Sequence, residues 1–264
     1  MIQRAFLPLA LVVLSSSASW GETVTLNAER DASLYESSGT RSNGAGGVIF
    51  TGTNSSGSPR RGLLQFDVAG GIPAGATIDS VQLTLTVAGV AGGGADPFPY
   101  VTGIYPVSRN WGEGTQGAGS STAGSGQGFP TPSDGTTATW THAFLADQPW
   151  TTVGGDFSAT PSATALVAGT VGTSFTWGST AAMVADVQGW LNNPAANFGW
   201  MVLGDEAEVS SFRSFHSREA TNAAIRPALA VTFTPVPEPS TFLLGAMALL
   251  SIGALRRRLG ACRH

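Results

Sequence analysis

Residues 81–87 read Val-Gln-Leu-Thr-Leu-Thr-Val, with an apolar side chain at every second position. A period of two is typical of a β-strand that buries one of its faces. Residues 61–68 alternate in a similar way, and residues 72–76, Ile-Pro-Ala-Gly-Ala, lie between the two segments. Proline and glycine favour a turn there. We therefore predict two strands joined by a turn, and the rest of the chain is placed around them.

Similar short segments recur along the chain, separated by glycine-rich turns. One helix is predicted where Met183, Val187 and Trp190 fall at helical spacing, and residues 192–194, Asn-Asn-Pro, end it. Many short strands with one short helix predict an all-β fold, an antiparallel, jelly-roll-like β-sandwich. Residues 112–135 lack periodicity and are expected to form a long loop or insertion. Further strands are predicted at residues 23–27, 32–35, 48–51, 100–107, 138–144, 174–177, 199–203, 212–217 and 228–234.

The first 18 residues have the features of a secretory signal peptide. Arg4 precedes a short apolar run, and Ser16 and Ala18 fit the small-residue positions of a cleavage site. We place the cut after Ala18, with a cut after Gly21 as the alternative. Residues 1–18 are therefore excluded from the fold, and the chain is expected to be exported.

The last 29 residues, 236–264, form a second processing segment. Pro237-Glu238-Pro239 precedes an uncharged apolar run at residues 240–255, and Arg256-Arg257-Arg258 follows it. We predict a transmembrane helix over 240–255, about 24 Å long, with the arginines on the cytoplasmic side of the inner membrane. An ordinary C-terminal anchor after a proline-rich linker is the alternative interpretation.

These features, in this order, resemble the PEP-CTERM sorting signal of Gram-negative bacteria. The resemblance implies recognition by an exosortase, a membrane-embedded cysteine transpeptidase that cleaves near Pro-Glu-Pro. Pro237, Glu238 and Pro239 would then be the recognition motif, with Arg256, Arg257 and Arg258 completing the signal. The family is associated with exopolysaccharide and biofilm production.

The body between the two processing segments, residues 19–235, is expected to form one β-sandwich domain. It contains 8 of the 13 basic residues and 16 of the 17 acidic residues, which gives a net charge of −8. The chain has no lysine, so no basic patch is available for nucleic acid, which is not expected as a partner. The single cysteine, Cys262, lies outside the body, whose stability must come from packing without a disulfide.

Three groups of motifs in the body resemble the DNRLRE family of extracellular bacterial β-sandwich domains. The opening group is residues 31–36, 41–44 and 60–67; the middle group is residues 109–114 and 138–140; the closing group is residues 215–219 and 226–229. Residues 114–138 depart from the family pattern. Some members of the family act as carbohydrate-binding modules, so the resemblance implies a β-sandwich and a link to carbohydrate.

Residue patterns for catalysis are scarce in the body. It contains two histidines, His142 and His216, and neither a Gly-x-Ser-x-Gly nor a His-Glu-x-x-His motif. We therefore expect no enzyme activity and no cofactor. Asp205, Glu206 and Glu208 form the densest acidic group, which predicts either a Ca²⁺ site or a solvated turn. For His216 a packed or surface position is expected.

Tryptophan is the better lead to function, because sugar rings stack on flat apolar faces beside hydrogen-bonding groups. Trp190 and Trp200 are expected in the core. Trp111 and Trp150 are the candidates for exposed sugar-binding platforms, with a structural role as the alternative.

The sequence thus predicts an exported, non-catalytic protein of the cell envelope or extracellular matrix of a Gram-negative bacterium. It would be anchored in the inner membrane before processing, and it would contact extracellular polysaccharide. The alternative is a structural or adhesive surface protein that binds other proteins or itself.

The sorting motif makes the first testable prediction. Replacing Pro237, Glu238 and Pro239 with alanine leaves the signal peptide and the apolar segment unchanged. Export should therefore continue while removal of the tail stops, and the unprocessed form should accumulate on an immunoblot of the host's membranes. Processing of this variant to the wild-type size at the wild-type rate would contradict the exosortase assignment.

Overall fold

The computed structural model describes residues 21–94, 96–121, 126–132 and 134–236, of which Gly21–Thr234 form one compact unit. The predicted signal peptide, residues 1–18, and the predicted transmembrane helix, residues 240–255, lie outside the described residues. Within the described ranges no helix is long and apolar enough to cross a membrane.

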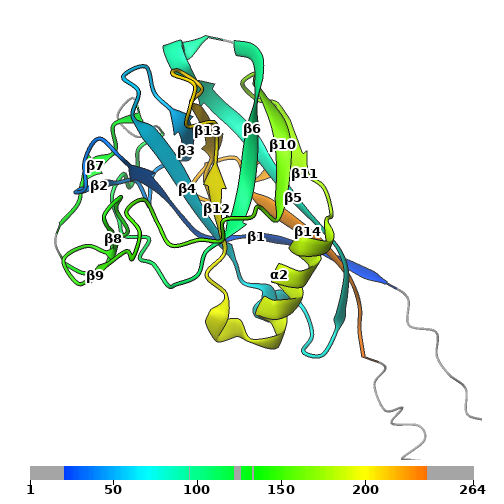
Figure 1. The fold of residues 1–264 in the computed structure, drawn as a ribbon. Coiled ribbons are helices and arrows are strands. Elements are labelled where there is room, and N and C mark those ends of the chain that lie inside the picture. The colour runs from blue at the N-terminus through cyan, green and yellow to red at the C-terminus, as the bar shows by residue number, and fades with distance from the viewer. Residues whose placement is uncertain (1–20, 95, 122–125, 133, 237–264) are drawn as a thin grey trace, which may run out of the picture. The chain divides into compact units, whose positions relative to one another are not determined.

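The unit consists mainly of β-strands, and every pairing between strands of the described residues is antiparallel (Figure 1). The helices are α1 (Val68–Gly71) and α2 (Ala181–Asn192), with 3₁₀ turns at Ala91–Gly93, Pro194–Ala196 and Ala223–Ile225. The strands are β1 (Glu22–Tyr35), β2 (Arg41–Ser42), β3 (Val48–Thr53), β4 (Pro59–Phe66), β5 (Thr77–Val90), β6 (Asp96–Pro106), β7 (Phe129–Pro130), β8 (His142–Phe144), β9 (Gln148–Pro149), β10 (Ala163–Gly169), β11 (Ser174–Trp177), β12 (Trp200–Leu203), β13 (Arg213–His216) and β14 (Ala228–Thr234).

Two long strands, β1 and β5, each take part in more than one sheet. The first half of β1 pairs with β14, and its second half pairs with β4 after a register shift between Ala28 and Arg30. Strand β5 pairs with β14 and β11 along most of its length and with β13 near its end. The pairings β11-β5-β14-β1 form the first sheet. The pairings β10-β6-β12-β4-β1-β2-β7 form the second, and hydrogen bonds link the two into one continuous network. Strands β13 and β3 connect the end of β5 to the start of β4.

The main hydrophobic core lies between the two sheets. Leu83 and Val231 contribute from the first sheet, and Leu64 and Val202 contribute from the second. Leu83 in β5 and Val231 in β14 alternate with less buried residues along their strands, as the period of two predicts. The prediction of a mainly antiparallel β fold is confirmed.

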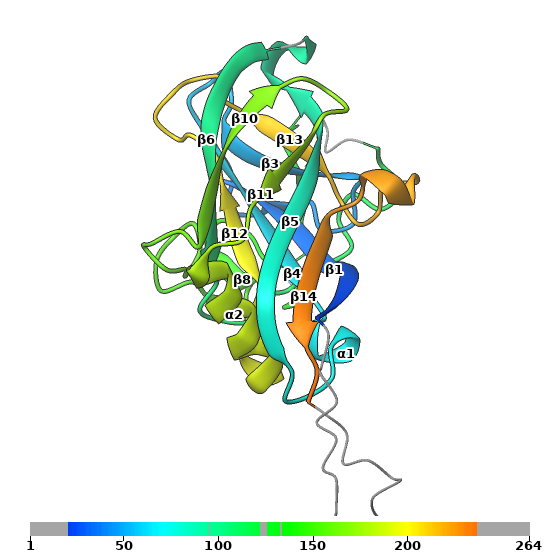
Figure 2. The same ribbon diagram turned by 90° about the vertical axis from the view of Figure 1, so that its right-hand side faces the viewer.

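Helix α2 packs against β5 at one end of the core (Figure 2). The Thr180 hydroxyl accepts a hydrogen bond from the Met183 amide at 3.1 Å and so caps the first turn. Met183, Val187 and Trp190 are buried, and the Trp190 ring meets Trp200 edge to face at 4.5 Å. The predicted helix and the predicted burial of both tryptophans are confirmed.

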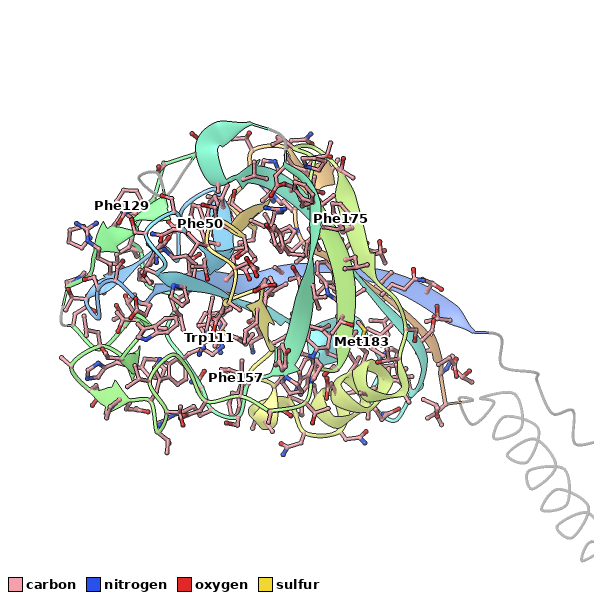
Figure 3. All side chains as sticks on the ribbon, turned by 45° about the horizontal axis from the view of Figure 1, so that its top comes forward. Phe50, Trp111, Phe129, Phe157, Phe175 and Met183 are labelled. Atoms are coloured by element: carbon pink, nitrogen blue, oxygen red, sulfur yellow. The ribbon has the colours of Figure 1, made fainter. Side chains whose placement is uncertain are left out.

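A second hydrophobic cluster covers the other face of the second sheet. Leu63 and Met201 point away from the main core and pack against Trp111, Trp140 and Trp150, all from the segment between β6 and β10. Figure 3 shows Trp111 and Phe157 in this region, separate from Met183. Strands β4 and β12 of the second sheet are therefore buried on both faces, which explains the unbroken apolar run Trp-Met-Val-Leu of β12.

Most of the predicted strands are present, but several details differ, among them the two-residue strands β2, β7 and β9, which were not predicted. The segments 23–27 and 32–35 belong to one strand, β1, because the chain continues through the bulge without a turn. Residues 138–144 contribute only the short β8. Strand β10 was not predicted, because its sequence, Ala-Thr-Ala-Leu-Val-Ala-Gly, is rich in small residues.

Two glycines with left-handed backbones test how closely β12 and β4 pack. Gly199 has φ +73°, and a Cβ there would lie 2.1 Å from the Leu64 carbonyl oxygen; Gly57 has φ +75° and open space around it. Gly57→Ala should cost about 1–2 kcal/mol for the left-handed backbone alone. Gly199→Ala should cost roughly 1–3 kcal/mol more, because β4 must move. Equal losses in urea unfolding would contradict this packing.

Candidate functional site

The two tryptophans predicted as platforms lie inside the protein. Trp111 is 0% exposed and Trp150 is 4% exposed. The Trp111 indole N–H donates to the Phe198 carbonyl at 2.9 Å, and the Trp150 indole N–H donates to the Thr139 carbonyl at 2.8 Å. The prediction that these rings are exposed is therefore wrong, and the structural alternative holds. The cause is the long segment between β6 and β10, which folds back over the second sheet and needs large rings to fill its own core.

The acidic turn at residues 205–208 is also structural. Asp205 accepts the amide hydrogens of Ala207 and Glu208 at 2.9 and 3.0 Å, which closes the turn. Glu206 forms a bidentate ion pair with Arg61 at 2.7 and 2.8 Å. Among the described residues no group of three or more acidic, histidine or cysteine side chains is arranged to hold a metal ion. These contacts favour the alternative of a turn, and the Ca²⁺ site at Asp205, Glu206 and Glu208 stays a prediction.

A hollow of about 470 Å³ lies on the face of β3 and β13 that points away from the main core. We call it the aromatic hollow, because the rings of Phe50 and Phe212 stack in its wall at 5.2 Å with 20° between their planes. Phe50 is buried, whereas Phe212 is partly exposed and offers its ring to the hollow. The lining residues are Val48, Phe50, Asn54, Ser55, Ala88–Gly93, Ser121, Gly126, Gln127, Phe212, Ser214 and His216.

The period of two along β3 and β13 builds this hollow. Ile49 and Phe215 point into the main core, so the residues on either side of each point outward. Phe50 from β3 and Ser214 and His216 from β13 therefore line the same face. An aromatic wall and a row of hydroxyl, amide and imidazole groups thus share one cavity.

His216 contributes an imidazole ring to the wall of the hollow. It is partly exposed, and none of the residues that the structure describes forms a hydrogen bond with its ring. Burial lowers the pKa of His216 below its ordinary value, so the imidazole is neutral at neutral pH. A neutral imidazole offers one donor and one acceptor to a ligand hydroxyl.

A second hollow, of about 530 Å³, shares His216 and Ser121 with the first. We call it the glycine hollow, because its other walls are mostly small residues. They are Ala45, Gly47, Ala118–Ser120, Glu219, Ala220, Thr221 and Ile225. The two hollows are therefore neighbours, with His216 and Ser121 in the walls of both.

Two buried arginines fix the chain around the aromatic hollow. Arg60 is 0% exposed, donates to the Gly126 carbonyl at 2.8 Å and lies 5.0 Å from the Tyr35 ring. Arg213 is 1% exposed and pairs with Asp96 at 2.9 Å. Gly126, held by Arg60, lies against the Phe50 and Phe212 rings. Both arginines act as positioning residues and leave no cation in the hollow.

The role of Phe50, Phe212 and Ser214 in lining a hollow was not predicted from the sequence. A signal was present in the predicted strand 212–217, where Phe212, Ser214 and His216 alternate. One aromatic and two polar residues on the same face of a strand are typical of a binding surface, because a core face would be apolar and a fully solvated face would be polar. Phe50 carries no such signal, because it sits in the apolar run Val-Ile-Phe of β3.

Residues 235–258 match the model of the PEP-CTERM protein-sorting motif. The prediction of this sorting signal is confirmed, and the motif implies exosortase-dependent export to the cell surface. The chain is thus an exported protein with a mainly antiparallel β body. A comparison of the chain with curated proteins finds no match. The resemblance of the body to the DNRLRE family stays a prediction.

The burial of the two tryptophans leads to a stability prediction. Trp111→Ala and Trp150→Ala should each lower the free energy of unfolding by about 3–5 kcal/mol, because each opens a cavity and leaves a carbonyl without its donor. Val153→Ala, at a side chain that is 58% exposed in the same segment, should stay within about 0.5 kcal/mol of wild type. Denaturant unfolding of the three variants measures the difference. Near-wild-type stability of both tryptophan variants would contradict the burial.

Proposed function

We propose that the body is a non-catalytic polysaccharide-binding domain that the sorting signal delivers to the cell envelope or extracellular matrix. The aromatic hollow would bind extracellular polysaccharide. A sugar ring would stack on the Phe212 ring, and the hydroxyl groups of the sugar would form hydrogen bonds with Ser214 and His216. The single observation that carries the proposal is the partly exposed Phe212 ring beside unpaired polar groups in a cavity of about 470 Å³.

The chemistry of the hollow favours a carbohydrate over other small ligands. A pyranose presents an apolar C–H face and a rim of hydroxyl groups, so it needs one flat ring and several neutral donors and acceptors. The lining supplies Phe212 as the ring, and Asn54, Gln127 and Ser214 as neutral polar groups. A polymer could continue past His216 into the glycine hollow.

The non-catalytic part of the proposal rests on the same lining. None of the described residues that line the aromatic hollow carries a carboxyl group, and His216 is the only ionisable residue among them. Hydrolysis of a glycosidic bond ordinarily uses a pair of carboxyl groups on either side of the bond. Binding without turnover is therefore the function that these residues favour.

We also propose the steps by which the protein is exported, held in the membrane and released. The signal peptide at residues 1–18 would export the chain, and the helix at 240–255 would hold it in the inner membrane. Exosortase would then cut near Pro237-Glu238-Pro239 and release the body toward the polysaccharide that it binds.

One observation favours the alternative, an adhesive or self-associating surface protein. Val101 of β6 and Leu166 of β10 are directly opposite each other, and their side chains are 53% and 62% exposed. Phe98, on the same strand as Val101, is 69% exposed. Phe98→Ala should weaken self-association if this is the function, and it should leave polysaccharide binding unchanged.

Affinity electrophoresis of the full-length chain in gels that contain soluble polysaccharides tests the proposal. Phe212→Ala should weaken binding by about 1–3 kcal/mol, as truncation of a base-stacking or anchor residue does elsewhere. Its melting temperature should stay close to that of wild type, because the ring is partly exposed. Phe98→Ala serves as the matched control for loss of an exposed phenylalanine. Equal retardation of wild type and Phe212→Ala in every gel would contradict the assignment of this site.

A further inference from the structure

Three chain segments meet beneath the glycine hollow, and hydrogen bonds join them. The Ser33 amide of β1 donates to the Asn43 carbonyl at 3.1 Å, and the Ser217 hydroxyl donates to the Gly46 carbonyl at 2.7 Å. The Arg218 amide donates to Asp31 Oδ2 at 2.8 Å. Residues 31–33, 43–46 and 217–219 are therefore neighbours, although the third segment lies more than 170 residues after the other two.

Each of these segments places one buried side-chain oxygen here without a hydrogen-bond donor. These oxygens are Asp31 Oδ1, Asn43 Oδ1 and Glu219 Oε2, and none of the described residues donates to them. Asp31 and Asn43 are both 0% exposed. A buried oxygen without a partner costs free energy, so such groups in native proteins usually have a hydrogen donor, a water molecule or an ion.

The backbone around Asn43 keeps its unpaired oxygen enclosed. The amide nitrogen of Asn43 donates to the Val48 carbonyl at 2.6 Å, which fixes the orientation of the side chain. A Cβ on Gly46 would lie 2.1 Å from Asn43 Oδ1, and a Cβ on Gly117 would lie 2.2 Å from it. Glycine at both positions thus leaves room for the oxygen, and this observation is independent of the acidic residues nearby.

The cluster also carries more negative than positive charge. Arg218 forms ion pairs with Glu113 at 2.7 Å and with Glu219 at 2.8 Å. Among the described residues, the Asp31 carboxylate receives one hydrogen bond, from the Arg218 amide. The neighbouring Arg30 is occupied by Gln65, Asn110 and the Trp111 carbonyl. Burial, followed by the charge of Glu219, raises the pKa of Asp31 well above its ordinary value, and burial raises the pKa of Glu219. Asp31, Glu113 and Glu219 thus share one guanidinium group, that of Arg218.

We propose that Asp31, Asn43 and Glu219 bind a calcium ion through their unpaired oxygens. Calcium is a hard cation that takes carboxylate and amide oxygens together with backbone carbonyls and water. One of the three ligands is an amide, so the site is compatible with the finding that no three acidic, histidine or cysteine side chains of the described residues could hold a metal ion. Glu219 also lines the glycine hollow, which gives the ion a route from solvent.

The ion would join the segment after β2 to the segment after β13, beside the glycine hollow that Glu219 lines. It would stabilise the fold and hold His216, three residues before Glu219, in position. This site is separate from the acidic turn at residues 205–208 and does not depend on polysaccharide binding.

Calcium titration of the full-length chain in mild detergent, after treatment with a chelator, tests the proposal. Calorimetry should detect one saturable site, with a Kd on the order of 10⁻⁴–10⁻³ M as in other extracellular modules. Calcium at about 100 times the Kd should raise the melting temperature by roughly 5–10 °C. Glu219→Gln and Asp31→Asn should remove both the heat and the shift, whereas Glu208→Gln, in the turn at residues 205–208, should keep both.

Two results would overturn the calcium site. The first is a wild-type chain that shows no saturable heat and no thermal shift up to about ten times the weakest expected Kd. The second is a calcium response that persists in Glu219→Gln. If Asp31→Asn does not fold, the wild-type titration and the Glu219→Gln variant still decide the question. A wild-type chain that is stabilised by low pH and indifferent to calcium would show that a proton takes the place of the ion.

Discussion

The pairing of β1 with two different partners is the constraint on which the rest of the structure depends. Its first half continues the first sheet through β14, and its second half joins the second sheet through β4. The irregularity between Ala28 and Arg30 turns the strand from one sheet to the other, as a β-bulge does. Because the two sheets share this strand, they must face each other and enclose one core without a disulfide.

The same bulge directs the polar chemistry of the body. Arg30 and Asp31 follow it immediately, and the Asp31 amide donates to Glu113 at 2.9 Å instead of to a neighbouring strand. Asp31 is thereby placed beside Arg218 and Glu219, at the base of the glycine hollow. The proposed calcium site thus lies where β1 passes from one sheet to the other. At this point the backbone amide of Asp31 is free of the regular hydrogen bonds between strands.

The aromatic hollow follows from the geometry of β3 and β13 in a similar way. These strands connect the end of β5 to the start of β4, and one face of each supplies Ile49 and Phe215 to the main core. On the opposite face Gly126 and Phe129 lie against the Phe50 cluster, while Phe212 and His216 stay partly exposed and border a hollow with Ser214. Position in the fold, more than any motif, makes these residues candidates for binding.

Local patterns predicted the parts of the fold that depend on local structure. Strands β11 and β14 agree with the predicted residues 174–177 and 228–234, and α2 agrees with the helical spacing of Met183, Val187 and Trp190. The sorting signal was equally readable, because its features are contiguous in the sequence.

The positions of Trp111 and Trp150 were not predictable in this way, because their burial depends on a segment of about fifty residues folding back over the second sheet. The adjacent apolar residues Met201 and Val202 indicate a strand buried on both faces, and they were the available clue. The grouping of Asp31, Asn43 and Glu219 depends on contacts between segments more than a hundred residues apart, which no local pattern records.

Binding of polysaccharide in the aromatic hollow is the central claim, and NMR of the histidine rings tests it most directly. The chain has three histidines, His142, His216 and His264, so the imidazole signals can be assigned by substitution. During titration with soluble fragments of the host's exopolysaccharide, the His216 signals should shift and saturate while those of His142 stay in place. Saturable binding of the fragments without any shift at His216 would contradict the account.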